Sequence, residues 1–332
     1  MNQCGLILAD EEGSKNTVVK FLDKIIPQNL VNIFLLNIKK CQYYSVHKRL
    51  RNSEINIFIL KVPYNWHRLD SFSRPMMKKV LNRIKEMLIL NNIKYIIVAG
   101  NKNIHTEYMK DFFSENGFVI TDGKILLSCL SIDILKKMLK VMDVDIRDVS
   151  VGIIDKQLTE KSKFLMNALS SYVKYITIVT QSLQKAQEYA EDIFDNTGLS
   201  IRISDISLMK RKFCNVLFVV DDIDEMTLRK ITNHKTIVFC LQGHLSNKIN
   251  YGTLIDSINI ALPEKIFEEG NNLKNFEYSK MIEAVILSGI NKEIDDLKAE
   301  DYWKIRSEFY KLNCKISVLK YSEKTIKNNK NQ

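Results

Sequence analysis

Short apolar, β-branched runs alternate with segments of helical periodicity along the second half of the chain. The apolar runs lie at residues 149–155, 175–180, 199–205, 215–222 and 236–242, and the segments 160–172 and 182–194 have the spacing of helices. Strands that alternate with helices of this length favour a parallel sheet covered by helices. The predicted fold class is therefore α/β, and this half is predicted to form a doubly wound parallel sheet of Rossmann type.

The first half of the chain shows a similar alternation of apolar runs and amphipathic segments. Strands are predicted at 31–38, 55–64 and 93–101, and helices at 74–90, 105–115 and 131–142. The segment 118–127 is predicted to form two short strands around Asp122 and Gly123, because this dipeptide is a typical hairpin turn. This half is therefore predicted to be an α/β unit of its own.

An acidic, polar connection at 143–148 separates the two halves. Single hydrophobic cores rarely grow beyond about 250 to 300 residues, and this chain has 332. We therefore predict an N-terminal α/β domain at 1–147 and a Rossmann-type domain with C-terminal helices at 148–322. The polar residues 323–332 are predicted to be a disordered tail.

Positive charge is concentrated in the first half of the chain. Residues 1–150 contain 23 Lys and Arg against 15 Asp and Glu, whereas residues 151–332 contain 26 against 24. Such an imbalance is compatible with an anionic partner, and the basic residues near Tyr43 and Tyr44 have the composition of a single-strand nucleic-acid surface. A solvated helical face in a Lys- and Asn-rich chain explains the same residues, so we expect no nucleic-acid groove.

The composition predicts a cytoplasmic protein without a membrane partner or a metal site. No apolar run reaches the roughly 20 residues that cross a bilayer, and the first residues carry acids where a signal peptide is basic. The six cysteines and five histidines are dispersed without short metal-ligand spacing. Asp221 and Asp222, followed by Asp224 and Glu225, could bind Mg²⁺, but a charge cluster at the amino end of a helix is favoured.

A dinucleotide site of the usual kind needs a glycine-rich turn directly after the first strand, because glycines let the backbone approach the pyrophosphate. Here Gly152 lies inside the strand, and the strand ends at Asp155, whose charge would repel a diphosphate. Donors could still come from the start of the following helix. The candidate cofactor-binding residues there are Lys156, Thr159, Lys161 and Ser162, of which Thr159 is also a good N-cap.

The end of the second strand is where such a domain usually contacts the ribose, through an acid for NAD. Thr180, Gln181 and Ser182 stand at this position, so they complete the candidate cofactor-binding set. Because no acid is present, NADP is the better guess if any dinucleotide binds. The favoured role of Ser182 is that of N-cap for the next helix.

An α/β domain followed by a Rossmann-type domain resembles shikimate dehydrogenase, glutamyl-tRNA reductase and related amino-acid-dehydrogenase-like enzymes. In those families, the stretch similar to YITIVTQSLQKAQEYA at 175–190 has Asn-Arg-Thr where this chain has Thr180, Gln181 and Ser182. The resemblance covers residues 149–241 and implies a small-molecule ligand in a cleft between the domains. Lys102 follows a predicted strand and is a candidate for a catalytic lysine, although an exposed loop lysine is favoured.

These observations favour a binding or regulatory protein, or an enzyme relative without redox chemistry, built on a degenerate Rossmann-type domain. An NAD(P)-dependent oxidoreductase with an unusual phosphate loop is the alternative. A nucleic-acid-associated protein that uses the basic first half is the second alternative. The sequence leaves the substrate and the oligomeric state open.

Overall fold

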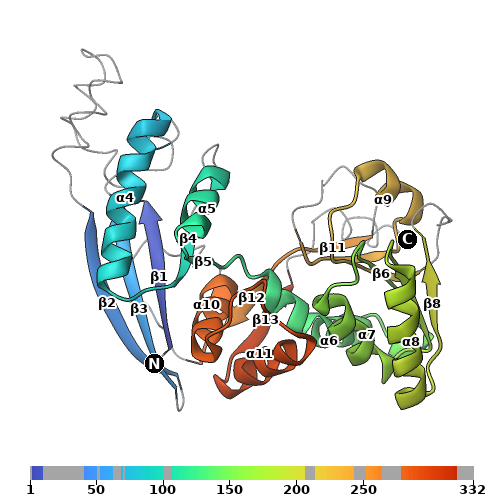
Figure 1. Ribbon diagram of the computed structural model, residues 1–332. Helices are drawn as coiled ribbons and strands as arrows, with labels where there is room; N and C mark the ends of the chain where they lie inside the picture. The colour runs from blue at the N-terminus through green and yellow to red at the C-terminus, as the bar shows by residue number, and fades with distance from the viewer. Residues whose placement is uncertain are drawn as a thin grey trace, which may run out of the picture. The chain divides into compact units, whose positions relative to one another are not determined.

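The computed structural model describes residues 2–9, 41–50, 53–62, 69, 72–99, 106–205, 214–242, 252–263 and 278–319. It confirms the predicted two-unit α/β fold (Figure 1). Unit 1 consists of Met1–Asp122 and Leu262–Ile294, and unit 2 of Gly123–Ala261 and Asp295–Gln332. The predicted strand at 31–38 and the predicted tail at 323–332 lie outside the described residues.

Unit 1 is built on one mixed sheet. Its strands are β1 (Asn2–Ala9), β2 (Gln42–Leu50), β3 (Ser53–Val62), β4 (Tyr95–Ala99) and β5 (Val119–Ile120), in the order β2-β3-β1-β4-β5. Strand β2 is antiparallel to β3, and the other neighbours are parallel. The described helices of this unit are α4 (Arg74–Leu90), α5 (Thr106–Glu115) and α10 (Tyr278–Ile290). Helices α4 and α5 lie next to each other (Figure 1).

Helix α4 has the bounds that its periodicity predicts. A proline stands in its first turn, where a missing amide donor costs nothing. Its buried residues recur at helical spacing and face the sheet: Met77, Val80, Leu81, Ile84 and Leu88. Helix α5 likewise ends as predicted, since Gly117 follows it with φ = 80°, a left-handed conformation that glycine adopts easily.

Helix α10 belongs to unit 1 although it comes late in the chain. It packs against β1 and β4. The backbone N–H of Gln3 donates to Ser288 Oγ (2.9 Å), and the Tyr95 hydroxyl donates to the carbonyl of Lys292 (3.2 Å). These long-range bonds explain why residues 262–294, which the sequence places in the second domain, cluster with the first unit.

Two predictions for the first half are wrong. The basic segment around Tyr43 is the edge strand β2, not a helical face. The expected hairpin at 118–127 is the two-residue strand β5 followed by helix α6 (Lys124–Val141). The apolar residues just after Gly123 are buried on all sides, and such a run does not show by periodicity alone whether it is strand or helix.

Unit 2 contains a parallel sheet of six strands. They are β6 (Ser150–Ile154), β7 (Tyr175–Val179), β8 (Ile201–Ser204), β9 (Val216–Val219), β10 (Ile237–Cys240) and β11 (Thr253–Ile255). Their order is β11-β10-β9-β6-β7-β8, and every neighbouring pair is parallel. Counted from β6, this is the strand order 3-2-1-4-5-6 of the Rossmann fold. The predicted doubly wound sheet is therefore confirmed.

Helices connect these strands and cover the sheet. Helices α7 (Glu160–Ser170) and α8 (Leu183–Thr197) follow β6 and β7, and α9 (Glu225–Ile231) follows β9. From β6 the chain adds β7 and β8 on one side of the sheet, and β9, β10 and β11 on the other. Because crossovers between parallel strands are right-handed, α7 and α8 lie on one face of the sheet and α9 lies on the other. The described part of the unit also contains α6, a 3₁₀ turn (Ile146–Asp148), α11 (Ala299–Lys311), and the antiparallel pair β12 (Ile258–Ala261) and β13 (Lys315–Leu319).

Helix α6 packs against α7 and α11, so its contacts place it in unit 2. The Asp133 carboxylate accepts two hydrogen bonds from the Arg306 guanidinium (2.8 and 2.8 Å) and one from the Tyr310 hydroxyl (2.8 Å). The boundary predicted at 147 separates α6 from β6, whereas this division places both in one unit.

None of the described helices combines the length and the apolar character needed to cross a membrane.

We expect Leu126→Ala to lower the free energy of unfolding by about 2 to 5 kcal/mol, the usual cost of truncating a fully buried leucine. Leu126 is 0% exposed in the first half of α6, whereas Val141 at the end of the same helix is 85% exposed. Val141→Ala is therefore the matched control and should change stability little. Urea unfolding followed by circular dichroism measures both, and equal effects would contradict the burial of the α6 amino half.

The Asp133–Arg306 pair predicts an acid-sensitive contribution to stability. Burial raises the pKa of Asp133, but the hydrogen bonds from Arg306 and Tyr310 outweigh it and hold this pKa below its usual value. The contribution is therefore complete above the unfolded-state pKa of about 3.9 and is lost as the pH falls through the folded-state pKa.

Asp133→Asn should thus destabilise the protein at neutral pH, and the stability difference from wild type should shrink as the pH approaches about 3. Urea unfolding over a pH series measures this difference. Asp195→Asn, at an exposed position of α8, is the control. A difference for Asp133→Asn that stays constant with pH would contradict the assignment.

Candidate functional site at the carboxyl edge of the second sheet

The strand order of unit 2 reverses between β6 and β9. In doubly wound sheets, ligands bind outside the carboxyl ends of the strands at such a switch point. Asp155 follows β6, Thr180 follows β7, and Asp221 lies two residues beyond β9. The candidate site is therefore the edge formed by these strand ends and by the amino end of α7.

The side chain of Asp155 is fully buried at this edge, with 0% exposure. Its Oδ1 accepts a hydrogen bond from the backbone N–H of Gln157 (3.1 Å). Its Oδ2 accepts from the backbone N–H of Thr159 (2.6 Å), the Thr159 hydroxyl (2.7 Å) and the Ser162 hydroxyl (2.6 Å). The amino end of a helix is where this fold usually holds a phosphate, and here a carboxylate of the chain itself lies there.

The loop between β6 and α7 is shaped without glycine. Leu158 has φ = 56°, a left-handed conformation that is unusual for a residue with a side chain. Its side chain is buried, so packing compensates for the strained backbone. The loop thus turns inward around Asp155 and does not offer the open, side-chain-free backbone of a phosphate loop.

The ends of β6 and β7 are joined through the carbonyl oxygen of Lys156. This oxygen accepts hydrogen bonds from the Gln181 backbone N–H (3.1 Å), the Thr180 hydroxyl (3.1 Å) and the Ser182 hydroxyl (3.4 Å). The Thr180 hydroxyl oxygen also accepts from the Ser182 backbone N–H (3.1 Å). The hydroxyl groups predicted to contact a ribose therefore take part in bonds within the protein.

Two buried lysines hold the carboxyl end of β10. Lys161 is 8% exposed, and its Nζ donates to the carbonyl of Leu241 (3.1 Å). Lys124 is 7% exposed, and its Nζ donates to the carbonyls of Cys240 (2.9 Å) and Asp256 (2.9 Å). The sequence prediction missed Lys124 because it placed this residue in a hairpin. The signal that could have found it is its position between Gly123 and a long apolar run.

Of the predicted cofactor-binding residues, Thr159 and Ser162 lie around Asp155, and Thr180, Gln181 and Ser182 lie around the Lys156 carbonyl. Lys161 instead reaches the carbonyl of Leu241. Ser182 is the N-cap residue of α8, as favoured, and Thr159 is the N-cap residue of α7. Neither hydroxyl makes a side-chain capping bond. Gln181 is exposed, and the side chain of Lys156 is half-buried. The catalytic candidate Lys102 lies outside the described residues.

Of the acidic residues after β9, Asp224 and Glu225 lie at the amino end of a helix, as favoured. Asp224 is the N-cap of α9, and its carboxylate accepts from the Thr227 backbone N–H (2.8 Å). Glu225 pairs with Arg229 one turn later (3.0 Å). Within the described part of the chain, no cluster of three or more His, Cys, Asp or Glu side chains could hold a metal ion.

Comparison with protein-family models and with curated proteins gives no match. Among solved structures, the chain is similar to L-tryptophan dehydrogenase from Nostoc punctiforme, with 10% identity, a TM-score of 0.33, and 93% of this chain and 79% of that one covered. Quinate dehydrogenase from Corynebacterium glutamicum in complex with NAD has 8% identity and a TM-score of 0.29, with 93% and 98% covered.

A chorismate mutase/shikimate 5-dehydrogenase fusion protein from Clostridium acetobutylicum has 12% identity and a TM-score of 0.25, with 94% and 99% covered. These TM-scores all lie below 0.5, so the likeness carries no argument about activity.

Asp155→Ala should lower the free energy of unfolding by about 3 kcal/mol or more, since each buried donor left without an acceptor costs about 1 to 3 kcal/mol. Asp222→Asn, at an exposed position beyond β9, removes a charge at the same edge and is the control. Urea unfolding measures both. A loss for Asp155→Ala no larger than that of the control would show that the carboxylate does not hold the loop.

Proposed function

We propose that the protein is a binding or regulatory protein, or a non-redox enzyme relative, whose Rossmann-type unit does not hold a dinucleotide at the amino end of α7. The observation that carries this proposal is the fully buried Asp155 carboxylate with its four hydrogen bonds. A diphosphate at this place would lie beside this carboxylate and would compete with it for the Thr159 backbone N–H. The chain therefore already supplies the anion for which this part of the fold is suited.

Electrostatics supports the same conclusion. A diphosphate beside Asp155 would place like charges a few ångströms apart in a water-poor environment, where repulsion is stronger than in water. Moving Asp155 aside would break four bonds that involve a charged group, each worth about 1.5 to 3 kcal/mol. Binding in the usual pose would have to compensate for both costs.

The ribose end of the site supports weak dinucleotide binding as well. The hydroxyls of Thr180 and Ser182 donate to the Lys156 carbonyl, and no acid stands at the end of β7 to accept from ribose hydroxyls. The exposed Gln181 and the half-buried Lys156 are compatible with a phosphorylated ribose. If a dinucleotide binds, NADP is therefore the better guess.

An NAD(P)-dependent oxidoreductase with an unusual loop is the second candidate. The observation that favours it is the strand order of unit 2, which places a switch point between β6 and β9 as in dinucleotide-binding domains. In this case the cofactor would contact the outer surface of the loop at Lys156 and would not reach the amides that Asp155 occupies.

Calorimetric titration separates the two candidates. We expect NAD and NADP to bind more weakly than about 100 μM, or less than about 5.5 kcal/mol of binding free energy. Tighter binding of either one, lost in Lys156→Glu and kept in the matched control Lys315→Glu on β13, would establish the oxidoreductase candidate in place of the proposed function.

A further inference from the structure

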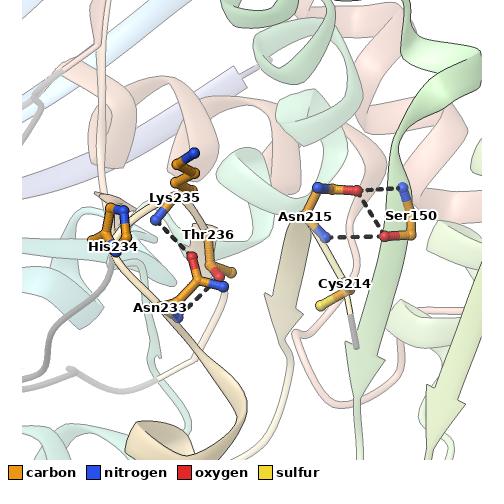
Figure 2. A pocket seen from close by; sticks show the side chains of 7 residues that line it. All are labelled: Ser150, Cys214, Asn215, Asn233, His234, Lys235 and Thr236. Atoms are coloured by element: carbon orange, nitrogen blue, oxygen red, sulfur yellow. Dashed lines mark hydrogen bonds between the residues drawn. The ribbon is translucent and has the colours of Figure 1, made fainter. Parts of the chain in front are cut away.

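A second site lies at the opposite edge of the same sheet, where β6, β9 and β10 begin. A pocket of about 310 Å³ opens there, lined by Ser150, Cys214, Asn215, Asn233, His234, Lys235 and Thr236 (Figure 2). All of these residues belong to unit 2. The volume is at the lower end of the range for small-molecule sites.

One wall of the pocket joins the starts of β6 and β9. Asn215 Oδ1 accepts hydrogen bonds from the backbone N–H (3.0 Å) and the hydroxyl (2.7 Å) of Ser150, as Figure 2 shows. The Asn215 backbone N–H donates back to Ser150 Oγ (3.1 Å). Because the Ser150 amide needs an acceptor, the orientation of the Asn215 side chain is fixed, and its Nδ2 is left as a donor.

The other wall is the turn at 233–236 before β10. Asn233 Oδ1 accepts from the Lys235 backbone N–H (2.7 Å), and the Asn233 backbone N–H donates to Thr236 Oγ1 (3.1 Å). Gly252 lies against this turn so closely that a Cβ there would come within 2.4 Å of the His234 carbonyl oxygen. Both walls are therefore held by bonds and contacts of the chain itself.

These bonds occupy the side-chain oxygens of Asn215 and Asn233 and leave their side-chain N–H groups available to a ligand. Within the described chain, no partner is found for Asn215 Nδ2, Asn233 Nδ2, the His234 ring or Lys235 Nζ. His234 and Lys235 are exposed, and the described residues that line the pocket include no carboxylate. We propose that this pocket binds a small anionic molecule through a carboxylate or phosphate group, because such groups accept several hydrogen bonds and complement a positive charge.

The thiol in the lining of the pocket is not poised for covalent chemistry. Cys214 is the nucleophilic residue in its lining, and burial raises the pKa of its thiol to about 12. The thiolate, which is the reactive form, is therefore scarce at neutral pH. This site is independent of the proposed function, which concerns the carboxyl edge of the sheet, so either can fail without the other.

Calorimetric titration of the full chain at low salt, with citrate and inorganic phosphate as probes, tests the proposal. We expect at least one probe to bind, and the two arms distinguish carboxylate from phosphate recognition. Lys235→Gln should weaken binding about tenfold or more, as expected for the loss of one charge-assisted hydrogen bond. Lys315→Gln, an equal change of charge at an exposed position of β13 outside the pocket, should leave it unchanged.

Thermal unfolding of both variants checks that they remain folded, and Asn233→Ala provides a second, uncharged change in the pocket that should also weaken binding. Absence of binding by both probes up to about 20 mM, far above typical metabolite affinities, would overturn the proposal. Equal weakening by Lys235→Gln and Lys315→Gln would overturn it too, because the attraction would then come from net charge alone.

Discussion

The carboxylate of Asp155 accepts hydrogen bonds from two backbone N–H groups just before α7, that of Gln157 in the loop and that of Thr159 at the N-cap position. The arrangement of the neighbouring residues depends on this interaction. The hydroxyls of Thr159 and Ser162 point to the same carboxylate, and the loop bends through Leu158 in a left-handed conformation to close around it. A carboxylate of the chain thus accepts from the N-cap amide of α7, at a helix end that usually attracts an external anion.

The strand order of the second unit is retained without the phosphate loop that usually accompanies it. The order depends on apolar strands that are buried on both faces, and these are present in β6, β9 and β10. The loops at the carboxyl edge lie outside these strands, so their sequence can change while the strand order stays the same. For this reason the fold does not determine the function, and the function of the second unit has to be inferred from the residues at its site.

The sequence predicted most of the elements whose signals are local. Helix α4 and strands β6 to β10 were found because their periodicity and length are distinctive. Strand β2 was missed because its conformation is set by its pairing with β3 and not by a local sequence signal. The start of α6 was missed because a fully buried apolar run has no helical periodicity. At the site, the missing glycines and the charge of Asp155 were visible in the sequence. The inward turn at Leu158, which brings Thr159 and Ser162 to that charge, depends on backbone geometry that residue types do not reveal.

A crystal structure determined in the presence of a high concentration of NADP tests the central claim most directly. The account predicts that Asp155 keeps its hydrogen bonds to Thr159 and Ser162, and that no diphosphate lies at the amino end of α7. A diphosphate bound to the Thr159 backbone N–H, with the Asp155 side chain turned away, would contradict it.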